Sequence, residues 1–99
     1  MLHPDFRSYH LAVALYNSCK QLSLPSHRKD QLLRAASSVV LNLSEGSAKP
    51  TPRDRQRYYS IAFASLREVQ SVIDLEQGEA GKLEPQADTL GAHLFRLTH

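Results

Sequence analysis

The sequence predicts an all-α fold, an antiparallel up-down-up-down four-helix bundle that forms a single domain over residues 1–99. Three observations lead to this prediction. Apolar residues recur at three- and four-residue spacing in four segments, and proline or glycine separates these segments. No segment shows the strict alternation of a half-buried strand. A chain of 99 residues can also bury a sufficient core without metal or disulfide.

The first two helices are delimited by proline, serine and glycine. The first opens at His3-Pro4-Asp5, because proline and an acidic residue are favourable in a first turn. Its apolar stripe consists of Ala12, Leu15, Tyr16, Cys19 and Leu22. Pro25 ends it, and Ser26 is expected to cap a second helix over about residues 27–45, with Gly46 as its left-handed terminator. The second stripe consists of Leu32, Leu33, Ala36, Val39, Val40 and Leu43.

The third helix is the longest, and a short fourth helix follows it. Thr51-Pro52-Arg53-Asp54 resembles a capping box and starts the third helix, over about residues 52–77. Its stripe consists of Tyr58, Ala62, Ser65, Leu66, Val69, Val72 and Ile73. Gly78 and Gly81 end it, and Glu84-Pro85 begins the last helix. The stripe of that helix consists of Ala87, Leu90, Leu94 and Leu97.

The two middle helices are more apolar than one buried face requires, since a core-facing stripe needs an arc of only about 100°. A second line of residues lies nearly opposite the core stripe of the second helix, and further residues flank the stripe of the third. One interpretation is an ordinary solvated face. The other, which the spare apolar area favours, is a subunit interface. The expected interface residues are Arg34, Ser38, Leu41, Glu45, Phe63 and Glu68.

The sequence contains no pattern typical of an enzyme, a metal site or a cofactor site. The Glu-x-x-His motif of di-iron bundles is absent, since Ala48 follows Glu45 and Ser71 follows Glu68 at that spacing. The five histidines are scattered, and no glycine-rich phosphate loop occurs. We therefore expect no catalysis, no metal and no cofactor. One cysteine, no leader and no apolar run of about 18 residues predict a cytoplasmic protein that does not enter membranes.

One charge cluster stands out against this background. Lys49, Arg53, Arg55 and Arg57 fall within nine residues, offset by Asp54 alone. Cations at a helix N-terminus oppose the macrodipole, so this placement does not serve stability. One interpretation is a solubilising surface. The alternatives are a site for the RNA or DNA backbone or for an acidic protein partner.

Two stretches in the second helix, residues 31–39 and 42–46, resemble the signature of a bacterial four-helix-bundle family. Its members were first noticed as open reading frames inside 23S rRNA intervening sequences. Leu22-Ser23-Leu24-Pro25 and residues 58–68 fit the same family. The resemblance implies a homopentameric ring. The family is similar to the accessory variability determinant of diversity-generating retroelements, a basic pentamer that binds nucleic acid and its reverse transcriptase.

Two functions follow as hypotheses. The first is a non-enzymatic ring that binds nucleic acid, as an accessory to a reverse transcriptase. The alternative is a protein-interaction scaffold without nucleic-acid affinity. Its basic loop would meet an acidic partner or the acidic C-terminal half of a neighbouring copy, where residues 68–99 hold six Asp and Glu against two Lys and Arg.

Overall fold

The computed structural model describes residues 6–99, and this part of the chain forms five α-helices and no strand. The helices are α1 (Arg7–Lys20), α2 (Ser26–Ser47), α3 (Pro52–Glu76), α4 (Gly78–Gly81) and α5 (Glu84–Thr98). The predicted all-α class is confirmed. The predicted start of the first helix at residues 3–5 lies outside the described residues. The single turn α4 was not predicted, and it occupies the connection between the two longer helices on either side of it.

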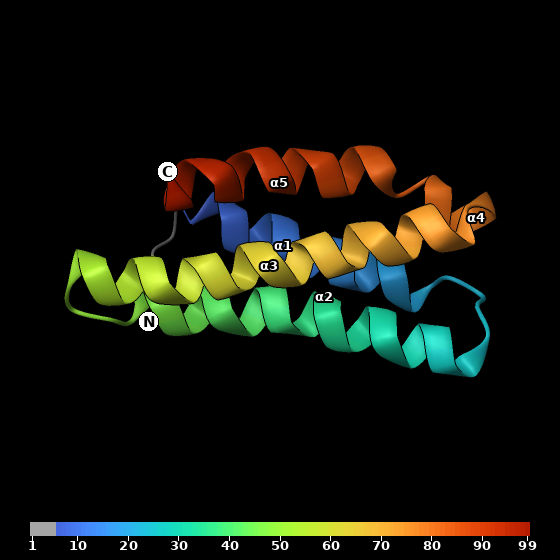
Figure 1. Cartoon of the computed structure of the whole chain (residues 1–99), viewed down its shortest axis with the longest axis horizontal. Coiled ribbons are helices and arrows are strands. Elements are labelled where there is room, and N and C mark those ends of the chain that lie inside the picture. The colour runs from blue at the N-terminus through green and yellow to red at the C-terminus, as the bar shows by residue number, and fades with distance from the viewer. Residues whose placement is uncertain (1–5) are drawn as a thin grey trace.

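The four long helices lie along one axis, which gives the molecule extents of 40 × 21 × 21 Å (Figure 1). α2 packs against α1 and α3, and α5 packs against α3 and α1, so these four helices enclose a shared core. Figure 1 shows the start of α3, the end of α2 and the end of α5 at the same end of the molecule. Segments that are distant in the sequence therefore meet there.

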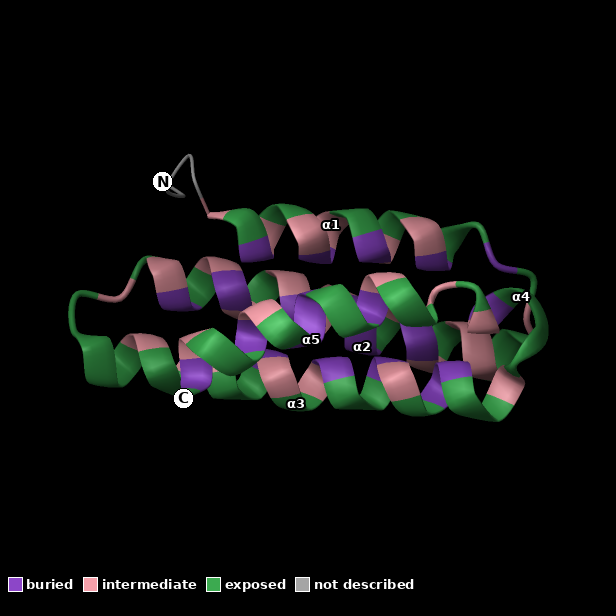
Figure 2. Cartoon of the chain, turned by 90° about the horizontal axis from the view of Figure 1, so that it is seen from above, coloured by how far each residue is buried: buried purple, intermediate pink, exposed green. Residues whose placement is uncertain are grey.

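The core is aliphatic, and the buried residues turn inward along each long helix (Figure 2). Its largest fully buried side chains are Leu15, Leu32, Leu43, Leu66, Ile73, Leu90 and Leu94, all of them members of the predicted stripes. Cys19 is also buried, and burial raises the pKa of its thiol to about 11, against a smaller lowering by Lys29. Leu33 and Val40 pack at the margin of this core and keep part of their surface in water.

The helix boundaries follow local chemistry in most places. Thr51 caps α3 as predicted, because its Oγ1 accepts a hydrogen bond of 3.2 Å from the Asp54 N–H, and Pro52 is the first helical residue. The predicted cap at Ser26 is wrong. Ser26 is already helical, and Pro25 stands at the cap position without a side-chain hydrogen bond.

Lys29 of α2 stabilises the C-terminal end of α1. The Lys29 Nζ donates to the Lys20 carbonyl at 2.9 Å and also to the Leu22 carbonyl. Carbonyls at a helix C-terminus lack partners within the helix and carry the negative end of the dipole, so an ammonium group satisfies both needs. This contact fixes the connection between α1 and α2.

The prediction that Gly46 ends the second helix is wrong. Gly46 lies inside α2 and is buried, and its φ is not in the left-handed region. A Cβ at this position would stand 2.7 Å from the Tyr59 Cε1 and 3.1 Å from the Tyr58 Cβ. Glycine is therefore needed because α3 approaches α2 closely here, rather than because the chain turns.

The left-handed residues that end a helix occur later in the chain. Gln77, with a φ of 50°, and Gly78, with a φ of 54°, end α3 and lead into α4. Gly91, by contrast, lies within α5 without breaking it. Of the helices described in residues 6–99, none has the length and hydropathy that a membrane crossing requires.

Candidate nucleic-acid and subunit interfaces

The four predicted cations occupy one end of the molecule, from the end of α2 to the first turns of α3, but they are not equally exposed. Arg53 and Arg57 are exposed and lie four residues apart on α3. Residues at this spacing lie on the same side of a helix. Together they form the most accessible pair of positive charges in this segment.

The other two predicted cations are engaged within the chain. The Arg55 Nη1 donates a hydrogen bond of 3.0 Å to the Lys49 carbonyl, and this bond braces the loop between α2 and α3. The Lys49 Nζ lies 3.5 Å from the Glu45 Oε1 and 5.0 Å from the centroid of the Tyr58 ring. Arg55 therefore has a structural role that the sequence did not reveal.

One of the two tyrosines of this segment does not lie where it was predicted. Tyr58 was expected in the core, but it is half-buried between Lys49 and Arg57, which lie 5.0 and 5.8 Å from its ring centroid. Tyr59 instead packs against the core, with its ring 6.0 Å from that of Phe6. Burial raises the pKa of the Tyr59 phenol, and Arg55 lowers it to a smaller extent.

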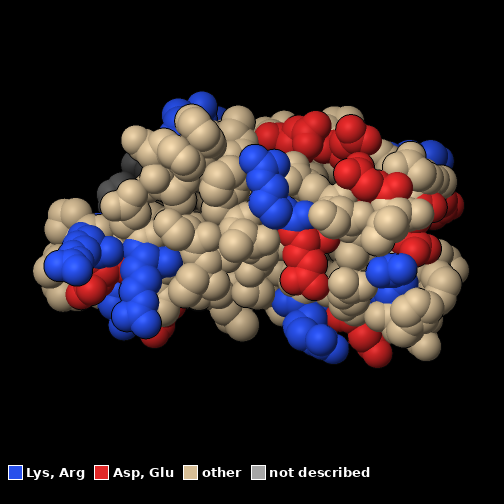
Figure 3. All heavy atoms as spheres, viewed as in Figure 1, with Lys and Arg blue, Asp and Glu red and all other residues tan. Residues whose placement is uncertain are grey.

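The same end of the molecule collects positive charge from α1, α3, α5 and the loop before α3. Residues 6–13, 42–62 and 92–99 meet there and contain six Lys and Arg against two Asp and Glu, a net charge of +4. The remaining described residues, 14–41 and 63–91, contain six against seven, a net charge of −1. Figure 3 shows this segregation, with basic side chains near the start of α3 and acidic ones over the start of α5. We call residues 6–13, 42–62 and 92–99 the basic end.

The predicted subunit-interface residues do not all share one face. Arg34, Leu41 and Glu45 are exposed along α2, and Leu41 keeps 65% of its surface in water. The Ser38 Oγ lies 2.7 Å from the Ser65 Oγ, so Ser38 belongs to the seam between α2 and α3. Ser38 was predicted on the line nearly opposite the core stripe of the second helix, and it is half-buried because α3 lies against that side of α2.

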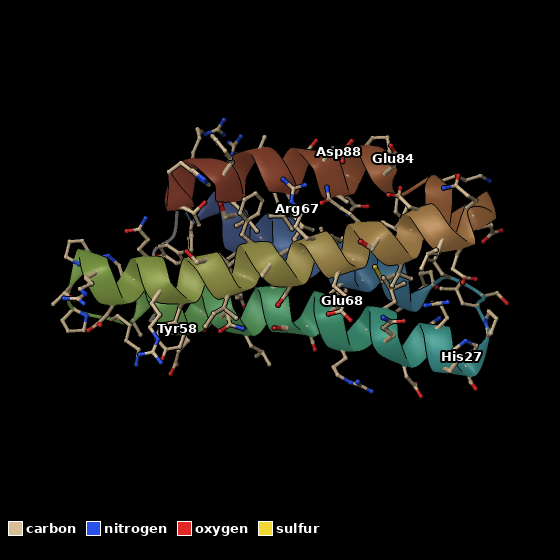
Figure 4. All side chains as sticks on the ribbon, in the orientation of Figure 1. His27, Tyr58, Arg67, Glu68, Glu84 and Asp88 are labelled. Carbon is tan, nitrogen blue, oxygen red and sulfur yellow. The ribbon has the colours of Figure 1, made fainter. Side chains whose placement is uncertain are left out.

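Phe63 and Glu68 lie on opposite flanks of α3. Phe63 turns toward α5, where its ring centroid is 6.5 Å from that of Phe95. Glu68 is exposed near the α2 side and accepts a long hydrogen bond of 3.4 Å from the Gln31 Nε2. Figure 4 shows Glu68 directed toward α2 and the neighbouring Arg67 directed toward α5. The two predicted residues therefore lie on different faces of a single subunit.

A shallow apolar groove adjoins the exposed line on α2. It has a volume of about 180 Å³ and is lined by Val13, Tyr16, Ser37, Val40 and Leu41. The sequence had marked Leu41 but not Val13, since the two lie on different helices. Within residues 6–99, no three His, Cys, Asp or Glu side chains are grouped as metal ligands would be.

The end of α5 contributes residues to the basic end that the sequence analysis missed. Phe95 and Arg96 are both exposed there. The available signal was the position of Phe95 next to the stripe formed by Ala87, Leu90, Leu94 and Leu97 rather than on it. A single apolar residue outside a core stripe is ordinary, but one that joins other apolar or aromatic side chains in a patch indicates an interaction surface.

The fold and the surface together define an all-helical protein whose net positive charge lies at one end. Residues 6–95 match the family model described as 23S rRNA-intervening sequence protein, and the chain belongs to this family. The predicted family is confirmed. Comparison with curated proteins and with solved structures gives no match.

Proposed function

We propose that the chain is a non-enzymatic, ring-forming helical protein that binds the nucleic-acid backbone. In this proposal it serves as an accessory to the reverse transcriptase of a diversity-generating retroelement. The observation that supports this function best is the basic end, with its net charge of +4 and the exposed pair Arg53 and Arg57. Membership of the 23S rRNA-intervening sequence family is consistent with a gene that is associated with RNA.

The proposal includes the arrangement of the subunit, an antiparallel four-helix bundle with up-down-up-down order. Support comes from the shared core of α1, α2, α3 and α5 and from the order in which they contact one another. α4 is then a one-turn element of the last connection. This arrangement leaves both exposed arginines of α3 at one end of each subunit.

Binding by this surface would follow the physics of phosphate neutralisation. One subunit offers few phosphate contacts, so its own affinity is weak. A ring that repeats Arg53 and Arg57 raises the local concentration of sites and strengthens binding to a long strand. Because neutralised phosphates release counterions, affinity falls steeply with salt. Contacts to the backbone alone carry no sequence information, so this surface has little sequence preference.

The test is a double variant, Arg53→Gln with Arg57→Gln, which leaves the loop-bracing Arg55 intact. We expect the affinity for RNA or DNA to fall roughly tenfold or more at low salt, and the salt slope to decrease by about 1 per lost contact. The measurement is a filter-binding titration at about 50 and 200 mM salt.

The matched control is Lys20→Gln with Lys82→Gln, which removes the same charge from two exposed residues outside the basic end. Equal affinity in the wild type and the Arg53/Arg57 variant would exclude this site. Absence of binding by the wild type at low salt would exclude nucleic-acid binding and leave the scaffold function.

Self-association is the second part of the proposal, with five copies as the expected number. The apolar groove supports it, because its lining residue Leu41 is exposed and a second subunit that covers the groove would remove this apolar surface from water. Arg34, exposed on the same helix, is proposed to meet a carboxylate, Glu45 or Glu68, of the next subunit.

Light scattering at micromolar concentration should give a multiple of the 11.1 kDa chain mass for the wild type and a smaller assembly for Leu41→Glu. The new charge would be buried without a partner in the interface. Leu75→Glu is the control, since Leu75 is equally exposed but lies on α3, outside the groove. A monomeric wild type, or a change of mass in both variants, would contradict this interface.

A protein-interaction scaffold remains the second candidate function. The charge contrast between the basic end and the acidic start of α5 favours it, because copies could meet through these surfaces. If the protein is such a scaffold, the oligomer forms but binds no RNA or DNA at low salt.

A further inference from the structure

Three aromatic rings form a cluster where the end of α5 meets α3. The rings of Phe95 and His99 are stacked, with centroids 4.0 Å apart and an interplanar angle of 12°. Phe63 meets both edge to face, at 6.5 Å from Phe95 and 6.3 Å from His99. Phe95 nevertheless keeps 51% of its surface in water. We call Phe63, Phe95 and His99 the aromatic platform.

The aromatic platform borders an open cavity at the basic end. The cavity has a volume of about 310 Å³ and is lined by Pro52, Arg55, Gln56, Tyr59, Leu97 and His99. The Gln56 Nε2 donates a hydrogen bond of 3.0 Å to the Thr98 carbonyl, which holds the end of α5 against the first turns of α3. His99 therefore belongs both to the platform and to a hollow beside the basic residues of α3.

The charge around the platform is almost entirely positive. Residues 52–67 and 92–99 contain five arginines and one acidic side chain, that of Asp54 at the very start of α3. The Arg67 guanidinium lies 4.7 Å from the centroid of Phe63. That ring already has a cation against it, whereas Phe95 presents its exposed surface outward. Arg53 and Arg96 are exposed on the two helices that flank the cavity.

We propose that the aromatic platform stacks an unpaired base of a single-stranded nucleic acid whose phosphates lie against the arginines of the basic end. The inference rests on the proposed nucleic-acid binding and narrows its ligand to a single strand. Sites for single strands combine a positive groove with exposed aromatic rings, since every base offers a π-face. A duplex keeps its bases stacked inside, so it contacts the arginines but not Phe95.

The test compares three ligands of equal length by fluorescence anisotropy: a single strand, the same strand with abasic residues, and a duplex. Wild-type protein is expected to bind the ordinary strand roughly tenfold more tightly than the abasic strand, because one stacked base contributes about that factor. A 2-aminopurine in the ordinary strand should be quenched on binding. This comparison needs no substitution in the protein.

Phe95→Ala should weaken binding of the ordinary strand roughly tenfold and leave the affinities for the abasic strand and the duplex unchanged. Phe95→Tyr keeps the ring and should restore binding. Ile61→Ala is the matched control, since Ile61 is also an exposed apolar residue, 41% in water, but lies outside the platform. Circular dichroism checks that each variant retains its helices.

The outcomes separate the platform from the proposed function itself. Equal affinity of the wild type for ordinary and abasic strands, with the Arg53/Arg57 variant still impaired, would overturn stacking and leave backbone binding in place. An unchanged affinity of Phe95→Ala for the ordinary strand would do the same. Failure of the wild type to bind any of the three ligands would overturn both.

Discussion

Replacing Leu66 with alanine is expected to lower the free energy of unfolding by about 2–5 kcal/mol. Leu66 is 0% exposed, and it sits on α3, which packs against both α2 and α5. Its Cδ2 reaches toward Gly91 of α5, 3.6 Å from where a Cβ would stand. Truncation leaves a cavity between the helices in addition to the lost burial of the removed carbons. A typical domain is stable by about 5–15 kcal/mol, so the loss would be a large share of the total.

Urea unfolding followed by circular dichroism measures this change. The matched control is Leu75→Ala on the same helix, because Leu75 keeps 66% of its surface in water and should shift stability by no more than about 0.5 kcal/mol. A similar loss of stability in both variants would mean that the two faces of α3 are buried to a similar extent in solution. That result would contradict a subunit in which Leu66 is buried and Leu75 is exposed.

Gly46→Ala is expected to destabilise the protein by about 1–3 kcal/mol, the usual cost of overpacking. Helix propensity alone predicts the opposite sign, since alanine is favoured over glycine in a helix by about 0.5–1 kcal/mol. The steric conflict dominates, because the new Cβ would lie 2.7 and 2.9 Å from two ring atoms of Tyr59. The Cβ would also lie 3.1 Å from the Tyr58 Cβ, an atom bonded to the backbone of α3 that cannot rotate aside.

Gly91→Ala is the control for the sign of this change in stability. Gly91 is also buried inside a helix, but its nearest neighbours, in Leu66 and Gln70, are at ordinary contact distances of 3.6 and 3.7 Å. The same substitution should therefore be neutral or stabilising there. Removing the ring in Gly46→Ala with Tyr59→Ala should give less than the sum of the two single losses. Additive losses would show that the Tyr59 ring is not what Gly46 accommodates.

The helices were predictable because their boundaries depend on local chemistry. Thr51 and Pro52 fix the start of α3 through one hydrogen bond and one preset dihedral angle, both readable from adjacent residues. The role of Gly46 was not readable in this way. A helix-ending glycine and a closely packed glycine look alike in sequence, and the deciding neighbour, Tyr59, belongs to the next helix.

The candidate site was predictable only where it is contiguous. Lys49, Arg53 and Arg57 are close in sequence, so their cluster was found, although the hydrogen bond that engages Arg55 required the loop conformation. The aromatic platform joins Phe63 to Phe95, which come from different helices. Their contact depends on how α5 packs against α3, and periodicity along a single helix does not contain that information.

Cys19 is a natural probe of local unfolding in this protein. Alkylating reagents react with the thiolate, and the thiol is both buried and held protonated by its pKa of about 11. Modification must therefore wait until α1 separates from its neighbours and exposes the sulfur. The rate of Cys19 labelling therefore reports how readily α1 separates, and no introduced probe is needed. If assembly into a ring covers α1, the labelling rate should fall.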